Sequence, residues 1–180
     1  MTLVCKPLTR AEKYQDDSAW LSVLPLIDIS WGLMSQLLKS VNGKFPYAEV
    51  LGKKKAYASA KEKTVRKGRP YHQLGDLVKG VVLTDDLQQT IAVSNFLINH
   101  FDVIKWEVKT GSVDNPYCGV IHIDVQLGAL TCEVQVMPKA TSKVKKVSNG
   151  FYKNNRAREA AHLWNTVENF SPSQRQLLGV

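Results

Sequence analysis

Residues 120–136 read VIHIDVQLGALTCEVQV, and this stretch decides the fold. Apolar and polar side chains alternate through 120–127 and again through 130–136, the period of two that predicts β-strands. Only Gly128 and Ala129 separate the two runs, and a two-residue connection with glycine first is typical of a type II′ turn. The stretch therefore predicts an antiparallel hairpin.

The hairpin defines which side chains share a face. With the residues that flank the turn paired, Asp124 faces Glu133. His122 faces Gln135 on the same side of the hairpin. The opposite side is apolar throughout and carries Ile121, Ile123, Val125, Cys132, Val134 and Val136. One face of the predicted sheet thus belongs to a core, and the other is a candidate polar site.

Opposed carboxylates on paired strands repel each other unless a cation or a shared proton neutralises them. We expect magnesium beside Asp124 and Glu133. Asp76 stands at the start of an earlier apolar run, and magnesium is typically held by one or two carboxylates plus substrate phosphates. Asp76 and Glu133 would form that pair. The alternative is that Asp124 and Glu133 point into water from an edge hairpin.

The rest of the chain predicts an α+β fold, a mixed and mainly antiparallel sheet flanked by helices. Apolar spacing predicts helices at 18–41, about 87–97 and 154–167, with Asp85 and Asp86 as caps of the second, and strands at 76–83 and 103–108. A basic segment occupies 139–146. We expect one domain over 1–180, with an N-terminal helical part (1–50), a catalytic-like core (51–152) and a C-terminal helix and tail (153–180). We interpret His100 as a packing or capping residue and Trp106 as a core residue.

A charged helix is predicted from about Lys53 to Lys67, ended by Gly68 and Pro70. Basic and hydroxyl side chains recur along it at four, four and three residues and share one stripe, with Lys53 at its N-terminal end: Lys55, Ser59, Lys63 and Arg66. Such a stripe can line a triphosphate, and the alternative is a solvated charged face.

The chain has 24 Lys and Arg against 16 Asp and Glu, a formal net charge of +8. This balance favours a polyanionic partner such as a nucleotide, RNA or phosphate, and the alternative is that the charge only keeps the protein soluble. Four lysines of the basic segment form either a phosphate-tracking patch or a solvated loop: Lys139, Lys143, Lys145 and Lys146.

Cysteine usage and the N-terminus predict a cytoplasmic protein. The chain has three cysteines, without paired metal-ligand spacing and without the even number of a disulfide framework, so we expect reduced thiols and no zinc site. No signal peptide is indicated, and residues 20–38 are interrupted by Pro25, Asp28 and Ser30, so no membrane span is expected.

Three motifs resemble the synthetase domain of the RelA/SpoT family, over residues 53–152. Gly52-Lys53-Lys54-Lys55, then Ser59 and Lys63, is similar to that family's Gly-Arg-x-Lys signature with its serine and basic residue, with Lys53 in place of the arginine. The run 76–80, Asp-Leu-Val-Lys-Gly, resembles the motif whose aspartate binds magnesium. Val81 occupies the expected place of an arginine that stacks on the ATP adenine.

The third motif lies in the hairpin. Glu133-Val134-Gln135 resembles the family's Glu-x-Gln, whose glutamate binds magnesium or activates the attacking hydroxyl, and His122 resembles the histidine of the preceding strand. The family's base-stacking tyrosine is expected at Cys118, and Tyr117 one residue earlier would take its role.

The resemblance implies a nucleotidyltransferase-like fold and a magnesium-dependent pyrophosphokinase that transfers pyrophosphate from ATP to a ribose hydroxyl of a nucleotide, in alarmone synthesis, or of the tRNA 3′ end. A toxin role restrained by an antitoxin or regulator protein is compatible with it. It implies that Glu133, Asp76 and Gln135 are catalytic, that Asp76, Glu133 and Asp124 hold the metal, and that nucleotides are bound by Lys53, Lys55, Ser59, Lys63, Arg66, Lys79, Tyr117 and His122.

Two other functions stay open. The resemblance places adenine-stacking arginines at both Lys53 and Val81. Their replacement fits a catalytically degenerate module that binds nucleic acid or a protein, since neither lysine nor valine presents the planar face of arginine. A nucleotidyltransferase of another family would use the same carboxylates but release pyrophosphate instead of AMP.

Overall fold

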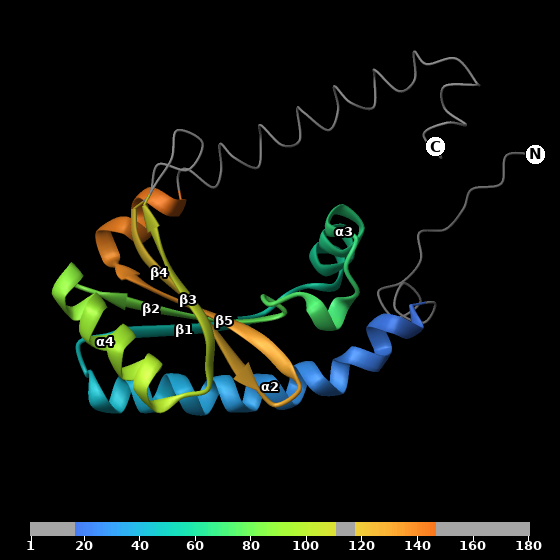
Figure 1. Cartoon of the computed structure of the whole chain (residues 1–180), viewed down its shortest axis with the longest axis horizontal. Helices are drawn as coiled ribbons and strands as arrows, with labels where there is room; N and C mark the ends of the chain where they lie inside the picture. The colour runs from blue at the N-terminus through green and yellow to red at the C-terminus, as the bar shows by residue number, and fades with distance from the viewer. Residues whose placement is uncertain (1–16, 111–117, 147–180) are drawn as a thin grey trace, which may run out of the picture.

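The computed structural model describes residues 17–110 and 118–146 (Figure 1). The elements follow the order α2 (Ser18–Lys44), β1 (Glu49–Lys54), α3 (Tyr57–Lys67), the 3-10 helix η1 (Tyr71–Gln73), β2 (Val78–Thr84), α4 (Leu87–His100), β3 (Val103–Thr110), β4 (Cys118–Leu127) and β5 (Leu130–Pro138). A further helix begins at residue 139 and continues to residue 146, where the described part ends. The predicted α+β class is confirmed.

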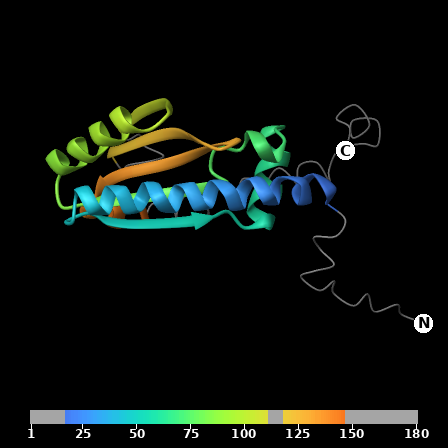
Figure 2. The ribbon, with the colours of Figure 1, turned by 90° about the horizontal axis from the view of Figure 1, so that it is seen from below.

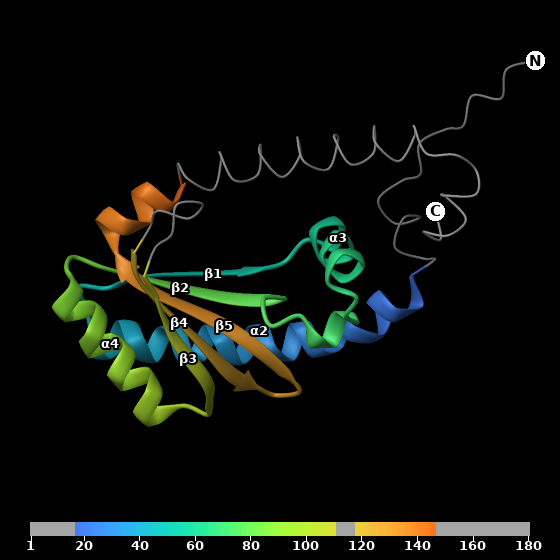
Figure 3. The same ribbon diagram turned by 45° about the horizontal axis from the view of Figure 1, so that its top comes forward.

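The five strands form one mixed sheet in the order β1-β2-β5-β4-β3. β2 and β5 are parallel, and the other three pairs are antiparallel. The predicted hairpin register is confirmed, with Asp124 opposite Glu133 and His122 opposite Gln135. Gly128 has φ +65° and no described non-glycine residue has a positive φ, the combination that a type II′ turn requires. Figure 3 shows β1 and β2 on one side of the sheet and β3 on the other.

Helices α2 and α4 lie on the same face of the sheet (Figures 1 and 2). Eight residues of α2 are buried, and apart from the adjacent Leu37 and Leu38 they follow one another at intervals of three or four: Trp20, Val23, Ile27, Ser30, Met34, Leu37, Leu38 and Val41. By length and composition α2 is also apolar enough to cross a membrane. In the structure this apolar stripe packs on the strands, including the predicted apolar side of the hairpin, every residue of which is buried.

Two glycines allow α2 to approach the sheet closely. A Cβ added at Gly52 of β1 would lie 2.9 Å from two ring carbons of Trp31, and one at Gly80 of β2 would lie 2.9 Å from Sδ of Met34. At both points the strand backbone is therefore in direct contact with a side chain of α2. The Trp31 ring is rigid, whereas the Met34 side chain is flexible, so the constraint is stricter at Gly52.

Asp17 fastens the N-terminus of α2 to α3 and η1. Its Oδ1 accepts from the backbone N–H of Trp20, which caps α2, and its Oδ2 accepts from the hydroxyls of Tyr57 at 2.9 Å and Tyr71 at 2.7 Å. Burial raises the pKa of Asp17, but the hydrogen bonds from Tyr71, the Trp20 amide and Tyr57 outweigh it and hold the pKa below its ordinary value. Helix α3 is thereby held at one end of the sheet (Figure 1).

The prediction of a charged helix beginning at Lys53 was wrong. Residues 49–54 form the edge strand β1, and the helix begins only at Tyr57. Five of the six β1 residues are exposed, so no apolar alternation marked the strand, which is held by pairing to β2 and by Trp31 above Gly52. Lys53 therefore lies on the sheet and Lys55 in the connection to α3, which ends before Gly68 at φ +59° as predicted.

The capping role of Asp86 in α4 is confirmed, because its Oδ1 accepts from the backbone N–H of Gln89 at 2.7 Å. His100 lies in the last turn of α4, bonds to the carbonyl of Phe96 through Nδ1 and stacks on the Phe96 ring, as expected of a packing or capping residue. The assignment of Trp106 to the core was wrong, because 54% of this residue is exposed on the edge strand β3. The predicted helix at 154–167, Tyr117 and residues 111–116 lie outside the described residues.

The approach of α2 to β1 predicts opposite effects of alanine at two glycines. Gly52→Ala should lower the free energy of unfolding by about 1–3 kcal/mol, because the new methyl group meets the Trp31 ring. Gly32→Ala, on the exposed side of α2 with nothing within 4 Å of the new Cβ, should raise it by about 0.5–1 kcal/mol. Urea denaturation measures both, and equal effects would contradict the close approach.

Candidate functional site

The face of the sheet opposite α2 and α4 carries the polar residues in rows across the strands. One row consists of charged residues only: Lys53, Lys79, Glu133, Asp124 and Lys105. The adjacent row contains Leu51, Val81, Gln135, His122 and Glu107. Two cations thus stand side by side next to two carboxylates. Like charges directly opposite are destabilising, so this face depends on ion pairs between strands or on a charged ligand.

Glu133 is the centre of the charged row. Its Oε1 accepts from Nζ of Lys79 at 2.7 Å and from Nε2 of Gln135 at 2.7 Å, and its Oε2 lies 3.4 Å from Nδ1 of His122. Burial raises the pKa of Glu133, but His122 and Lys79 together outweigh burial and hold it well below its ordinary value. Glu133 is therefore an ionised carboxylate in a largely buried place.

The pKa of Asp124, opposite Glu133, is shifted in the other direction. Burial and then repulsion from Glu133 raise the pKa of its carboxyl group. The cation that the opposed carboxylates require is therefore supplied at Glu133 by Lys79 of the parallel neighbour β2.

His122 has one ring nitrogen beside Glu133 and one without a partner in the described part of the chain. Because the Glu133 carboxylate only accepts, the nitrogen that pairs with it, Nδ1, carries the hydrogen. Nε2 is buried without a hydrogen-bond partner among the described residues. In the neutral imidazole this nitrogen is an acceptor, so His122 offers a basic lone pair that Glu133 orients.

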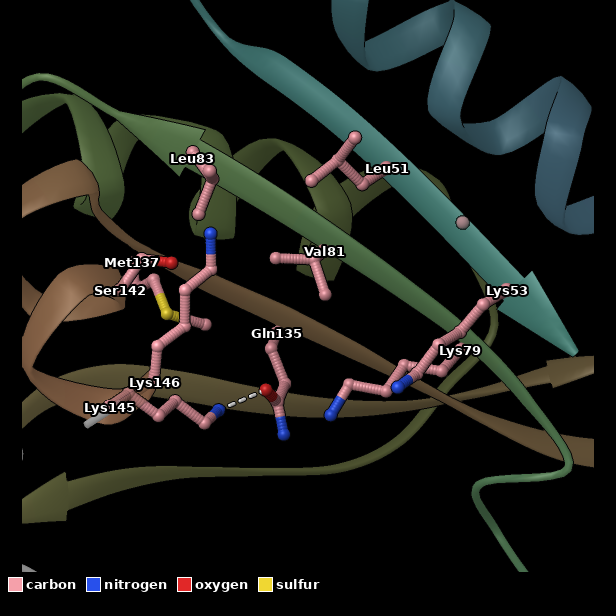
Figure 4. Close-up of a pocket in the computed structure, with 11 residues that line it drawn as sticks. Leu51, Lys53, Lys79, Val81, Leu83, Gln135, Met137, Ser142, Lys145 and Lys146 are labelled. Atoms are coloured by element: carbon pink, nitrogen blue, oxygen red, sulfur yellow. Dashed lines mark hydrogen bonds between the residues drawn. The ribbon is translucent and has the colours of Figure 1, made fainter. Parts of the chain in front are cut away.

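A lysine from the last described helix fixes the orientation of Gln135. Nζ of Lys145 donates to Oε1 of Gln135 (Figure 4). Because lysine can only donate, the amide must turn its oxygen to Lys145 and its Nε2 to Glu133. Burial and then repulsion from Lys79 lower the pKa of Lys145 to about 8.

Asp76 lies in the turn before β2, between two lysines. Its Oδ2 is 2.9 Å from Nζ of Lys55 and 2.8 Å from Nζ of Lys63 on α3. Burial raises the pKa of Asp76, but the hydrogen bonds from Lys63 and Lys55 outweigh it and lower the pKa. Its other oxygen, Oδ1, is buried without a hydrogen-bond partner among the described residues.

A pocket of about 290 Å3 opens beside Glu133, over β1, β2 and β5. Figure 4 shows Lys53 and Lys79 reaching in from the strands and Lys145 and Lys146 from the helix at 139–146. Aliphatic side chains line the space between these ammonium groups: Leu51, Val81, Leu83 and Met137. Apolar walls with charged groups at the margin suit a ligand that has a flat apolar part and several negative charges.

The residues fit a divalent cation through Asp76 more directly than through the hairpin. Oδ1 of Asp76 is an unpartnered, hard oxygen acceptor of the kind magnesium takes, with phosphate oxygens completing the coordination. Asp76, Glu133 and Asp124 do not gather into one site: within 17–110 and 118–146 no three His, Cys, Asp or Glu side chains form a metal-binding group. Glu133 and Asp124 as metal ligands stay a prediction.

Several predicted site residues are brought together and others are not. Lys53 and Lys79 line the pocket, and Lys55 and Lys63 meet at Asp76. Arg66 pairs instead with Glu62 of its own helix at 3.2 Å, and Ser59 lies exposed on α3. Lys139, expected in a phosphate patch, bridges Glu49 and Asp85.

The sequence interpretation missed the contacts of Glu133 with Lys79 and of Gln135 with Lys145. Both depend on neighbours far apart in the chain. The sequence does carry one signal for this arrangement: Lys79, Val81 and Leu83 are two residues apart, so in a strand they lie on one face.

Comparison with solved structures identifies the fold. The structure of a GTP pyrophosphokinase family protein from Streptococcus pneumoniae matches with a TM-score of 0.65 and 16% identity, over 89% of this chain and 84% of that one. Small alarmone synthetase 2 from Bacillus subtilis matches with a TM-score of 0.62 and 15% identity, over 89% and 96%. This chain has the small alarmone synthetase fold.

Small alarmone synthetase 1 from Bacillus subtilis, bound to its product pppGpp, is a third match, with a TM-score of 0.57 and 17% identity over 83% of this chain and 98% of that one. No family model and no curated protein matches the sequence. The fold expected from the RelA/SpoT resemblance is therefore confirmed. Because the identities are only 15–17%, these matches show the fold of this chain and not its chemistry.

The environment of Lys145 predicts an unusual titration. In a 13C NMR titration its Cε signal should have a midpoint near pH 8 in the folded protein and near the ordinary lysine value of about 10.4 in urea. Lys79→Met should raise the folded midpoint, because it removes the nearby positive charge while the burial remains. A folded midpoint that Lys79→Met leaves unchanged would contradict the arrangement.

Proposed function

We propose that this protein is a pyrophosphokinase that transfers the β,γ-pyrophosphoryl group of ATP to a ribose hydroxyl, with release of AMP. The observation that carries the proposal is the ionised Glu133 between Lys79 and His122, beside a lysine-lined pocket on an alarmone synthetase fold. The acceptor is either the ribose of a nucleotide, so that the product is an alarmone, or the 3′ end of tRNA. In the second case the protein acts as a toxin that an antitoxin restrains.

Lysines hold the donor in this mechanism. In this proposal the base of ATP packs against the aliphatic side chains of Leu51 and Val81, and Lys53 and Lys79 lie at the edge of the same pocket. The phosphates then extend toward Lys55 and Lys63 at the end of the sheet. Charge that develops on the transferred group is met by ammonium groups already in position, which stabilises the transition state.

Asp76 would hold Mg2+ through Oδ1 together with the donor phosphates. Magnesium held there would supply positive charge that offsets the negative charge of the phosphates. Lys55 and Lys63 keep the Asp76 carboxylate ionised and fixed on its other oxygen, so the free oxygen points in a constant direction. In this part of the site the two lysines therefore act by orienting the Asp76 carboxylate.

The acceptor hydroxyl loses its proton to the pair formed by His122 and Glu133. Nε2 of His122 takes the proton, and the ionised Glu133 at Nδ1 stabilises the imidazolium that results. The acceptor oxygen then forms a bond to the β-phosphorus of ATP, the bond from that phosphorus to the α,β-bridging oxygen breaks, and AMP leaves. Gln135 holds Glu133 in place from the other carboxylate oxygen.

Loss of the Glu133 charge should stop transfer without preventing binding. Glu133→Gln should lower the rate of pyrophosphate transfer by about 10²- to 10⁴-fold, because the imidazolium is no longer stabilised. The assay supplies γ-labelled ATP and magnesium with GDP, GTP, ADP or total tRNA in turn, and measures labelled acceptor and AMP. Glu62→Gln, which removes an exposed carboxylate of α3 that pairs with Arg66, is the matched control and should retain activity.

The acceptor that becomes labelled names the substrate. Release of pyrophosphate instead of AMP would show a nucleotidyltransferase of another kind. Binding of ATP or tRNA without any transfer would favour the degenerate binding module, for which the lysine and valine at the stacking positions are the supporting observation.

The aliphatic wall predicts a gain of affinity from an introduced arginine. Val81→Arg should tighten ATP binding roughly threefold to tenfold, because a guanidinium group stacks on the adenine where valine offers only a small apolar surface. Calorimetry with a non-hydrolysable ATP analogue measures the change, and Val81→Leu is the control that enlarges the side chain without adding a planar cation. Equal affinities of both variants would place the base elsewhere.

A further inference from the structure

Strand β3 ends the sheet on one side and exposes apolar residues there. In the described part of the chain β3 pairs with β4 alone, so its outer backbone edge faces no other strand. Trp106 and Val108 alternate on the face shared with Ile121 and Ile123, and they are 54% and 50% exposed. Ile104, at a register shift, is 56% exposed. An apolar edge strand of this kind is a template for pairing with another chain.

The opposite edge of the sheet is protected. There β1 carries Lys53 and Lys54 in succession and a glycine, which suits an edge that stays in water. On β3 the charged residues Lys105, Glu107 and Lys109 all lie on the other face from Trp106, so none interrupts the apolar row. Register shifts occur only at the two ends of β3, and 105–109 pair regularly.

We propose that β3 pairs antiparallel with β3 of a second copy of this chain, with the two Trp106 side chains facing each other across a two-fold axis. This geometry joins two five-stranded sheets into one and covers the apolar row of each copy with that of the other. It is an isologous contact of the kind that closes a dimer.

Charge selects the register. With Trp106 opposite Trp106, Lys105 of each copy faces Glu107 of the other, so two opposite-charge pairs form on the polar face. Val108 then lies opposite residue 104 of the second copy, where β3 has its register shift. A shift that places Glu107 opposite Glu107 sets Lys105 against Lys109, so all charged pairs become like-charged.

A further shift, with Val108 opposite Val108, again pairs Glu107 with a lysine, Lys109. It leaves only residues 106–110 of β3 overlapped, whereas the register centred on Trp106 overlaps residues 103–109. Because every additional pair adds backbone hydrogen bonds and apolar contact, the longer overlap is the more stable of the two registers whose charges match.

A charge swap tests the contact. The full chain should behave as a dimer in analytical ultracentrifugation over a wide concentration range. Lys105→Glu should make it monomeric because two glutamates then face each other, and Glu107→Lys should do the same with two lysines. The double variant Lys105→Glu with Glu107→Lys should dimerise again. A wild-type protein that is monomeric at all concentrations would overturn the proposal, and so would a dimer that persists in either single variant.

Cysteine cross-linking tests the register. Trp106→Cys should form an intermolecular disulfide under mild oxidation, because its two copies face each other. Val108→Cys is the matched control and should not, since its two copies are roughly 13 Å apart along the strands, beyond the reach of a disulfide. Cross-linking through Val108→Cys alone would overturn the register. Both residues are half exposed, so the variants keep the core intact, and pyrophosphate transfer measured in parallel shows whether the site depends on the contact.

Discussion

The polar face of the sheet depends on the parallel pairing of β2 with β5. This pairing sets Lys79 beside Glu133 and so compensates a largely buried carboxylate that also faces Asp124. Without Lys79, burial would raise the pKa of the Glu133 carboxyl group, and of the two groups that lower this pKa only His122 would be left. With Lys79 in place, Glu133 is ionised, and an ionised Glu133 orients both His122 and Gln135.

The division of the sheet into two faces depends on small residues as much as on large ones. The stripe of α2 reaches the strands because Gly52 and Gly80 leave room for Trp31 and Met34. Since this face holds the core, the opposite face is left for charge. The same strand that presents Gly80 to α2 presents Lys79 and Val81 to the pocket on the other side. Packing on one face therefore positions the site on the other.

The end of the sheet near Asp76 and its two edge strands make different contacts. At one end, Asp17 ties α2, α3 and η1 together, and this places Lys63 of α3 over Asp76. The two edge strands also differ, because β1 contributes Lys53 to the pocket, whereas no β3 residue lines the pocket and β3 exposes Trp106 and Val108 on its apolar face. A contact through β3 would therefore leave the pocket open to nucleotide, so catalysis and association would use separate edges of one sheet.

The sequence by itself determined the hairpin, its register and the division of its side chains into an apolar and a polar set, because a two-residue turn and a period of two leave one arrangement. It also predicted α2, the cap at Asp86 and the mixed sheet. Tertiary structure alone decided that 49–54 is a strand, since β1 is held by its partner β2 and by Trp31 and has no apolar alternation of its own. It alone decided that Lys79 and Lys145 serve Glu133 and Gln135, and that Trp106 is exposed at an edge. The reason is that strand order and side-chain neighbours across a parallel pair depend on long-range packing, which no local spacing encodes.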